Sequence, residues 1–212
     1  MYKEEELKKL TNIYKHIKSY QKILQNRSIN GVLESAYKKG KWWALTTDRP
    51  NINFDGLNIV CPQRSIRNTF AISTTSFCSS ADIYYISQNK PNYNMKYILS
   101  ILNSKLIYYW LYWLGKRKGE ILELYLEPLQ YIPIKKADEQ TQNKFVSIVD
   151  KILAITQTDD YLQNQEKQEA VKEYEKQIDF MVYKLYDLTY DEVLTIDKDF
   201  TLSEQEYNTF KI

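Results

Sequence analysis

The fold is decided by the stretch from Tyr97 to Lys135, which reads YILSILNSKLIYYWLYWLGKRKGEILELYLEPLQYIPIK. It joins the longest apolar periodicity in the middle of the chain to a basic turn and then to two strand-like runs. The apolar and aromatic residues that recur at intervals of three and four are Leu99, Leu102, Leu106, Tyr109 and Trp113. This spacing predicts one buried amphipathic helix, with Asn94 as its N-cap and Gly115 as its stop.

A basic segment follows this helix pattern. Lys116, Arg117 and Lys118 lie between Gly115 and Gly119. Because glycine on both sides loosens the backbone, we expect a flexible cationic loop here. Phosphate is one natural partner for such a loop.

Toward the N-terminus, one long helix and several strands are expected. Apolar residues with helical spacing predict a helix over residues 3–26, which must pack on another part of the protein. Strand-like runs bounded by Pro, Asn and Gly lie at residues 41–45, 58–61, 69–73, 82–87, 121–126 and 131–134. These runs predict a small mixed β-sheet with packed helices.

After residue 137 the pattern becomes helical. Asp138 can cap a helix, and two apolar stripes follow, which contain Ile152 and Ile178. They predict an antiparallel helical hairpin with both isoleucines in its buried seam, and two capping boxes predict two short terminal helices. The fold class is therefore α+β, and the expected divisions are an N-terminal helix (1–27) packed on the hairpin, a sheet-rich domain (28–136), and the hairpin with its terminal helices (137–212).

Composition limits the location and the kind of site. The net charge is only +2, so any basic surface must be local. Cys61 and Cys78 lie in no metal-binding pattern, and the chain opens with charged residues rather than an apolar leader, so we expect a cytoplasmic protein. The apolar run over residues 106–114 is shorter than the roughly 20 residues that span a bilayer. We expect no membrane contact from it.

No catalytic pattern is present in the sequence. The glycines form no nucleotide-binding loop, and no proline precedes an aspartate, as a PD-(D/E)xK nuclease would require. An Asn-Pro-Pro-Tyr tetrad of an amino-methyltransferase is also missing, and His16 is the single histidine. We therefore expect no catalytic residue, no metal and no cofactor in this chain, and a surface position for His16.

Basic residues interleaved with aromatic and amide side chains are the candidates for DNA binding. They are Lys38, Lys39, Lys41, Trp42 and Trp43, then Arg64, Arg67 and Asn68, and finally Lys116, Arg117 and Lys118. Arg can read guanine and Asn can read adenine, whereas Lys mostly contacts phosphate. We expect Arg64 and Arg67 to read bases and the 116–118 segment to contact phosphates. The alternatives are solvated loops and, for the tryptophan pair, core and rim packing in place of a base-stacking platform.

The order of the segments resembles a known family. The pieces that carry the resemblance are YKHIKSYQKILQNR (14–27), KWWAL (41–45), LNIVCPQRS (57–65), NTFAIS (68–73), YILSILNSKLIYYWL (97–111), GKRKG (115–119), LEPLQYIPI (126–134) and QIDFMVYKLYDLTYDEV (177–193). In this order they are similar to the C-terminal target-recognition domain, the TaqI-like specificity domain, of type IIG restriction-modification enzymes and N6-adenine DNA methyltransferases.

The resemblance implies a domain that holds one face of a DNA duplex and reads the target site. A separate upstream methyltransferase domain would flip and methylate adenine. S-adenosylmethionine and magnesium are then expected only in the missing methyltransferase or endonuclease domains, supplied in cis or in trans. The chain would be either a C-terminal fragment or a free-standing specificity polypeptide. A rival hypothesis is a subunit-docking module in which the basic loops are only solvated.

Overall fold

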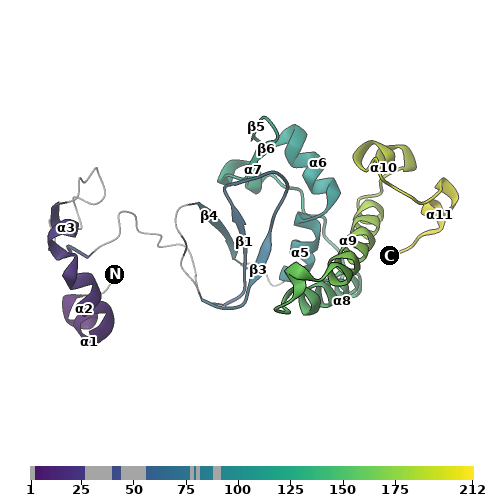
Figure 1. Ribbon diagram of the computed structural model, residues 1–212. Coiled ribbons are helices and arrows are strands. Elements are labelled where there is room, and N and C mark those ends of the chain that lie inside the picture. The colour runs from purple at the N-terminus through teal and green to yellow at the C-terminus, as the bar shows by residue number, and fades with distance from the viewer. Residues whose placement is uncertain (1–2, 27–39, 44–55, 77–78, 80–81, 88–91) are drawn as a thin grey trace. The chain divides into compact units, whose positions relative to one another are not determined.

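The computed structural model describes residues 3–26, 40–43, 56–76, 79, 82–87 and 92–212. The chain forms two compact units, Met1–Ile52 and Asn53–Ile212, whose elements are labelled in Figure 1. In the first unit, the segment predicted as one helix is divided into α1 (Glu4–Lys9), α2 (Thr11–Ser19) and α3 (Gln21–Asn26). The prediction of a continuous helix is wrong because Leu10 leaves the helical region, with φ −85° and ψ 67°.

Residues 40–43 lie in a turn, so the strand predicted at residues 41–45 is not found in its described part. Trp42 is buried and Trp43 is half-buried. Their rings meet edge to face, with centroids 5.7 Å apart. The two tryptophans therefore pack on one another instead of pointing to opposite faces of a strand. His16 is exposed, as predicted.

The second unit contains two antiparallel sheets of three strands each. The first sheet has the order β3-β1-β4, formed by β1 (Asn58–Pro62), β3 (Ala71–Ser73) and β4 (Ile83–Ser87). The second has the order β2-β6-β5, formed by β2 (Arg64–Ser65), β5 (Arg117–Lys118) and β6 (Ile121–Glu123). Only Gln63 separates β1 from β2, so the chain passes there from the first sheet to the second. The structure confirms the α+β class, and every pairing between described strands is antiparallel.

The helix predicted between Asn94 and Gly115 is two helices, α5 (Met95–Leu102) and α6 (Lys105–Leu114). Asn94 caps α5 as expected, and Ser104 caps α6. At the corner between them, the Asn103 amide exchanges two hydrogen bonds of 2.9 Å with the backbone of Phe70. The new start shifts the helical phase. Trp113, predicted on the buried face, is 61% exposed.

The two strands predicted at residues 121–126 and 131–134 also differ from the structure. β6 ends at Glu123 and is followed by α7 (Leu126–Gln130), and no strand forms over residues 131–134. Instead, tyrosine hydroxyls hold this segment. The Tyr97 hydroxyl donates to the Lys135 carbonyl at 2.6 Å, and the Tyr186 hydroxyl donates to the Pro133 carbonyl at 2.5 Å.

The C-terminal part is helical as predicted. It contains α8 (Glu139–Thr156), the 3₁₀ turn η1 (Tyr161–Gln163), α9 (Gln165–Leu185), α10 (Tyr190–Ile196) and α11 (Glu204–Thr209). Figure 1 shows α8 and α9 side by side, with α5 between them and the first sheet. The two predicted capping boxes are present at the starts of α10 and α11. Ile178 is buried in the core, whereas Ile152 is only half-buried against it.

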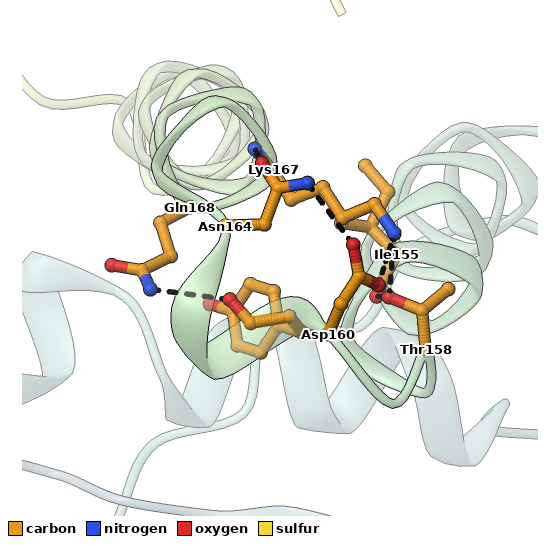
Figure 2. Close-up of polar contacts among 7 residues, drawn as sticks. Ile155, Thr158, Asp160, Asn164, Lys167 and Gln168 are labelled. Carbon is orange, nitrogen blue, oxygen red and sulfur yellow. Dashed lines mark hydrogen bonds and ion pairs between the residues drawn. The ribbon is translucent and has the colours of Figure 1, made fainter.

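The tip of this hairpin is fixed by side-chain hydrogen bonds, as Figure 2 shows. The Asp160 carboxylate accepts from the Lys167 ammonium and, at 3.0 Å, from the Asn164 amide. The Gln168 amide donates to the Tyr161 carbonyl at 3.1 Å and to the Leu162 carbonyl at 2.9 Å. Because these contacts join the turn to the first turn of α9, α8 and α9 are held in a defined hairpin. Across the described ranges, no helix has both the length and the apolar composition to cross a membrane.

Candidate nucleic-acid interface

The second sheet gathers basic side chains on one face. Residues directly opposite one another in an antiparallel pair point to the same side of the sheet. Arg64 lies opposite Glu123, and Lys118 lies opposite Ile121. Leu122, which lies between Ile121 and Glu123 in β6, is fully buried and points to the core. The outward side is therefore shared by Arg64, Lys118, Ile121 and Glu123.

Lys116 belongs to the same side, because it precedes Lys118 by two residues and strand side chains alternate. Its ammonium lies 3.8 Å from a carboxylate oxygen of Glu123. We name the outward side of this sheet the cationic face, and its residues are Arg64, Lys116, Lys118, Ile121 and Glu123. It carries three positive charges against one carboxylate, so it is a local basic surface on a chain of nearly balanced charge.

Arg64 is the most firmly held cation of this face. Its Nη2 donates to the Tyr125 hydroxyl at 2.9 Å, and its Nε lies 3.8 Å from Oε1 of Glu123. The Tyr125 hydroxyl lies 3.4 Å from the same carboxylate oxygen. The hydrogen bond to Tyr125, followed by the nearby charges, raises the pKa of Arg64 further above its usual value. The guanidinium is thus charged and restrained, although 64% of the Arg64 side chain is exposed. The side chain of Glu123, in contrast, is only 11% exposed.

The basic segment 116–118 is part of a hairpin and is not the flexible loop predicted from its flanking glycines. Gly119 has a φ of +61°, which lets two residues connect β5 to β6. Arg117 points away from the cationic face, toward α6. Its Nε donates to the Tyr112 carbonyl at 3.1 Å, and its guanidinium lies 4.1 Å from the centroid of the Tyr112 ring. Arg117 therefore joins the hairpin to α6, and its contact with phosphate stays a prediction.

Asn68 is buried, so the structure contradicts its predicted DNA contact. Its amide donates to the carbonyls of Leu102 at 2.7 Å and Ser104 at 2.9 Å, which uses both of its N–H groups at the corner between α5 and α6. Arg67, its neighbour, is exposed, and its charge acts on Glu175 of α9. Only Arg67 of this pair can reach a ligand.

The first basic cluster gives a mixed result. Lys38 and Lys39 lie outside the described residues. Lys41 is half-buried in the turn, and Trp42 is only 6% exposed. A base could not stack on Trp42 without displacing the residues that cover it, so the structure contradicts its predicted DNA contact.

Two residues of the site, Tyr125 and Glu123, were not predicted. Their alternation in LELYL is the only sequence signal that places them on one side of a strand. Exposed apolar side chains also border the hairpin, namely Trp113, Leu114, Ile121 and Leu126. They widen the surface on which a partner could rest.

Other chemistry finds little support in the described part of the chain. No group of three His, Cys, Asp or Glu side chains there is arranged to hold a metal ion. Burial raises the pKa of the Cys61 thiol to about 12, so this cysteine is not a ready nucleophile. The arrangement of the second sheet instead suits the binding of an extended polyanion.

Comparison with known proteins agrees with this arrangement. The family model of the TaqI-like C-terminal specificity domain matches residues 2–134. The match spans both sheets, α5, α6 and the cationic face, and it ends before the helical hairpin and the QIDFMVYKLYDLTYDEV segment. No match was found among curated proteins.

Proposed function

Because the chain belongs to the family of TaqI-like C-terminal specificity domains, we propose that it binds duplex DNA and reads the target site for a restriction-modification enzyme. Other domains, in cis or in trans, would methylate adenine with S-adenosylmethionine or cleave with magnesium, as in a type IIG system of the cytoplasm. This chain would supply the specificity and no catalytic residue.

The observation that carries the proposal is the cationic face. Lys116 and Lys118 lie on one side of a short strand, and lysine contacts phosphate as an orientation-tolerant point charge. Arg64 lies on β2, on the other side of β6 in the same sheet, and exposed Arg67 follows it. Phosphate contacts would set the position of the duplex, and the arginines would approach base edges.

Binding to DNA is tested by fluorescence anisotropy with pooled random duplexes over a series of salt concentrations. A protein that neutralises phosphates must bind more weakly as salt rises. Replacing Lys116 and Lys118 by Gln should lower the magnitude of the log–log salt slope by about 1.8, since each lost phosphate contact removes about 0.9. The matched control is Lys198→Gln with Lys211→Gln, which removes the same charge from the C-terminal end of the chain and should leave the slope unchanged.

The rival function, subunit docking, predicts a different result. If the exposed apolar residues around the hairpin bind only a protein, DNA binding will be absent or insensitive to salt. An unchanged slope in the Lys116→Gln, Lys118→Gln variant would also exclude the cationic face as the phosphate-binding surface.

A further inference from the structure

The restraint on Arg64 is directional. In a guanidinium, Nε and Nη2 form one edge, and Nη1 with the second hydrogen of Nη2 forms the end. Nε faces Glu123 and Nη2 donates to Tyr125, so the protein occupies the edge. Nη1 forms no hydrogen bond or ion pair with the part of the chain that the structure describes. The end of the guanidinium formed by Nη1 and Nη2 can therefore bind a ligand. Its orientation is fixed by the contacts of Nε with Glu123 and of Nη2 with Tyr125.

Glu123, which orients Arg64, is buried, and backbone hydrogen bonds hold its strand in place. Glu123 is 9% exposed and pairs in the sheet with Arg64. Its backbone N–H donates to the Lys116 carbonyl at 2.7 Å, and the following N–H, of Leu124, donates to Gln63 at 2.8 Å. Because both neighbouring strands fix the Glu123 backbone, the carboxylate offers Arg64 a rigid reference point.

Such an arrangement suits a neutral pair of acceptors better than a phosphate. The Glu123 carboxylate, 3.8 Å from Arg64, would repel a phosphate oxygen brought to the same guanidinium. A guanine edge presents two adjacent acceptors, O6 and N7, without a full negative charge. Bidentate reading also needs a side chain held in one orientation, which a phosphate contact does not.

We propose that Arg64 is a specificity-determining residue that reads one guanine of the target site through O6 and N7, with Tyr125 and Glu123 as its positioning residues. The proposal rests on the proposed function and deepens it by naming the base. Lys116 and Lys118, on the same face, would hold the flanking phosphates.

The test selects duplexes from a randomised pool with the 212-residue chain and then measures binding to the selected site. The wild-type chain should enrich a site with one invariant guanine. Arg64→Lys, which keeps the charge but not the fork, should lose the preference at that position alone, by about 5- to 150-fold. Tyr125→Phe should lower it by about 2- to 12-fold, as expected for one net hydrogen bond, although Arg64 is intact.

Modified DNA tests the contact without any change to the protein. Replacing the invariant guanine by 7-deazaguanine removes N7, and should weaken wild-type binding but leave the Arg64→Lys variant almost unaffected. Lys118→Gln is the control, because it should weaken cognate and random duplexes by similar factors and leave the preference intact.

The outcomes separate this inference from the proposed function. Arg64 is not the reader if the Arg64→Lys variant keeps the guanine preference, or if 7-deazaguanine weakens binding of both proteins equally. The proposed function still stands in that case, provided that random duplexes bind with a steep salt dependence. If the wild-type chain binds no DNA, or binds it without salt dependence, both proposals fail.

Discussion

The ammonium of Lys105 donates to the carboxylate of Asp197 at 2.7 Å, although the two residues are 92 positions apart in the chain. Lys105 is the first residue of α6, where a positive charge opposes the helix dipole. Asp197, at the end of α10, is 5% exposed and also accepts from the Tyr183 hydroxyl at 3.2 Å. The end of α10 thus holds the start of α6, and the other end of α6 leads into the hairpin of β5 and β6.

Loss of this ion pair should destabilise the protein. Lys105→Met leaves the buried Asp197 carboxylate without its charged partner. We expect the free energy of unfolding to fall by about 1 to 3 kcal/mol, less than for a fully buried pair because 42% of the Lys105 side chain is exposed. Urea unfolding measures it, and a cycle with Asp197→Asn isolates the coupling. Strictly additive effects of the two changes would show that the pair contributes nothing.

A second carboxylate at the same helix start predicts an unusual pH dependence. Asp179 accepts from the Lys105 backbone amide at 2.8 Å. Burial raises the pKa of Asp179 to about 7, the Lys105 amide and charge oppose the rise, and Asp197 and Glu175 add to it. Between the unfolded pKa of about 3.9 and this value, the folded protein holds a proton that the unfolded chain releases. This group therefore makes the protein less stable as pH rises through that window.

Asp179→Asn removes this titration and keeps an oxygen acceptor for the Lys105 amide. The wild-type protein should lose stability relative to the variant by up to about 1.4 kcal/mol per pH unit across the window, and the difference should become constant above it. Unfolding curves at a series of pH values measure the difference. Asp159→Asn, the same change at an exposed position, is the control. Parallel pH profiles of Asp179→Asn and the wild type would contradict the assignment.

The hairpin tip should respond to pH in the opposite sense. Hydrogen bonds from Lys167 and then Asn164 lower the pKa of Asp160 below its usual range. Its contribution is therefore present above the unfolded pKa of about 3.9 and is lost as pH falls through the lower folded value. Asp160→Ala should lower the melting temperature near neutral pH, and the deficit should shrink in strong acid. Glu166→Gln, which changes a nearby exposed carboxylate, is the control. An equal loss of melting temperature in the Asp160→Ala variant at neutral pH and in strong acid would contradict the prediction.

Asn68 should matter for stability and not for DNA affinity. Asn68→Ala leaves the Leu102 carbonyl without its donor and leaves the Ser104 carbonyl with only the Tyr108 amide, which should cost about 1 to 3 kcal/mol. Urea unfolding gives the cost, and anisotropy at a temperature where the variant is folded gives the affinity. Asn143→Ala, at an exposed position of α8, serves as the control. Selective loss of cognate binding by a stable Asn68→Ala protein would restore Asn68 as a base contact.

The hairpin seam is buried unequally. Ile178 is 6% exposed, so Ile178→Ala should cost about 2 to 5 kcal/mol, and Ile178→Asp should cost more because it buries an unpaired carboxylate. The half-buried Ile152 should tolerate the same changes better. Chemical denaturation ranks the variants, and equal costs at the two positions would show that the seam is buried evenly.

Several elements could be predicted because their cause lies within a few residues. Asp138 caps α8 by accepting from the amide of Thr141, and Thr189 and Ser203 complete their boxes with glutamates three positions later. The helical hairpin followed from apolar spacing for the same reason. The division of the central helix could not be predicted this way. Its apolar spacing runs without interruption through Asn103, whose partner, Phe70, lies 33 positions away.

The family resemblance and the positions of the basic residues were readable in the sequence, but their roles were not. Arg64 and Tyr125 are 61 positions apart, and only the pairing of β2 with β6 brings them together. The pairing of β5 with β6 turns Lys116 and Lys118 outward, while the alternation of the strand sends Arg117 to Tyr112. The sequence by itself determined helix caps and local charge, because these depend on contacts a few residues apart. Which cations point outward from the sheet and which hold the fold was decided by the tertiary structure, because strand register sets the side to which each one points.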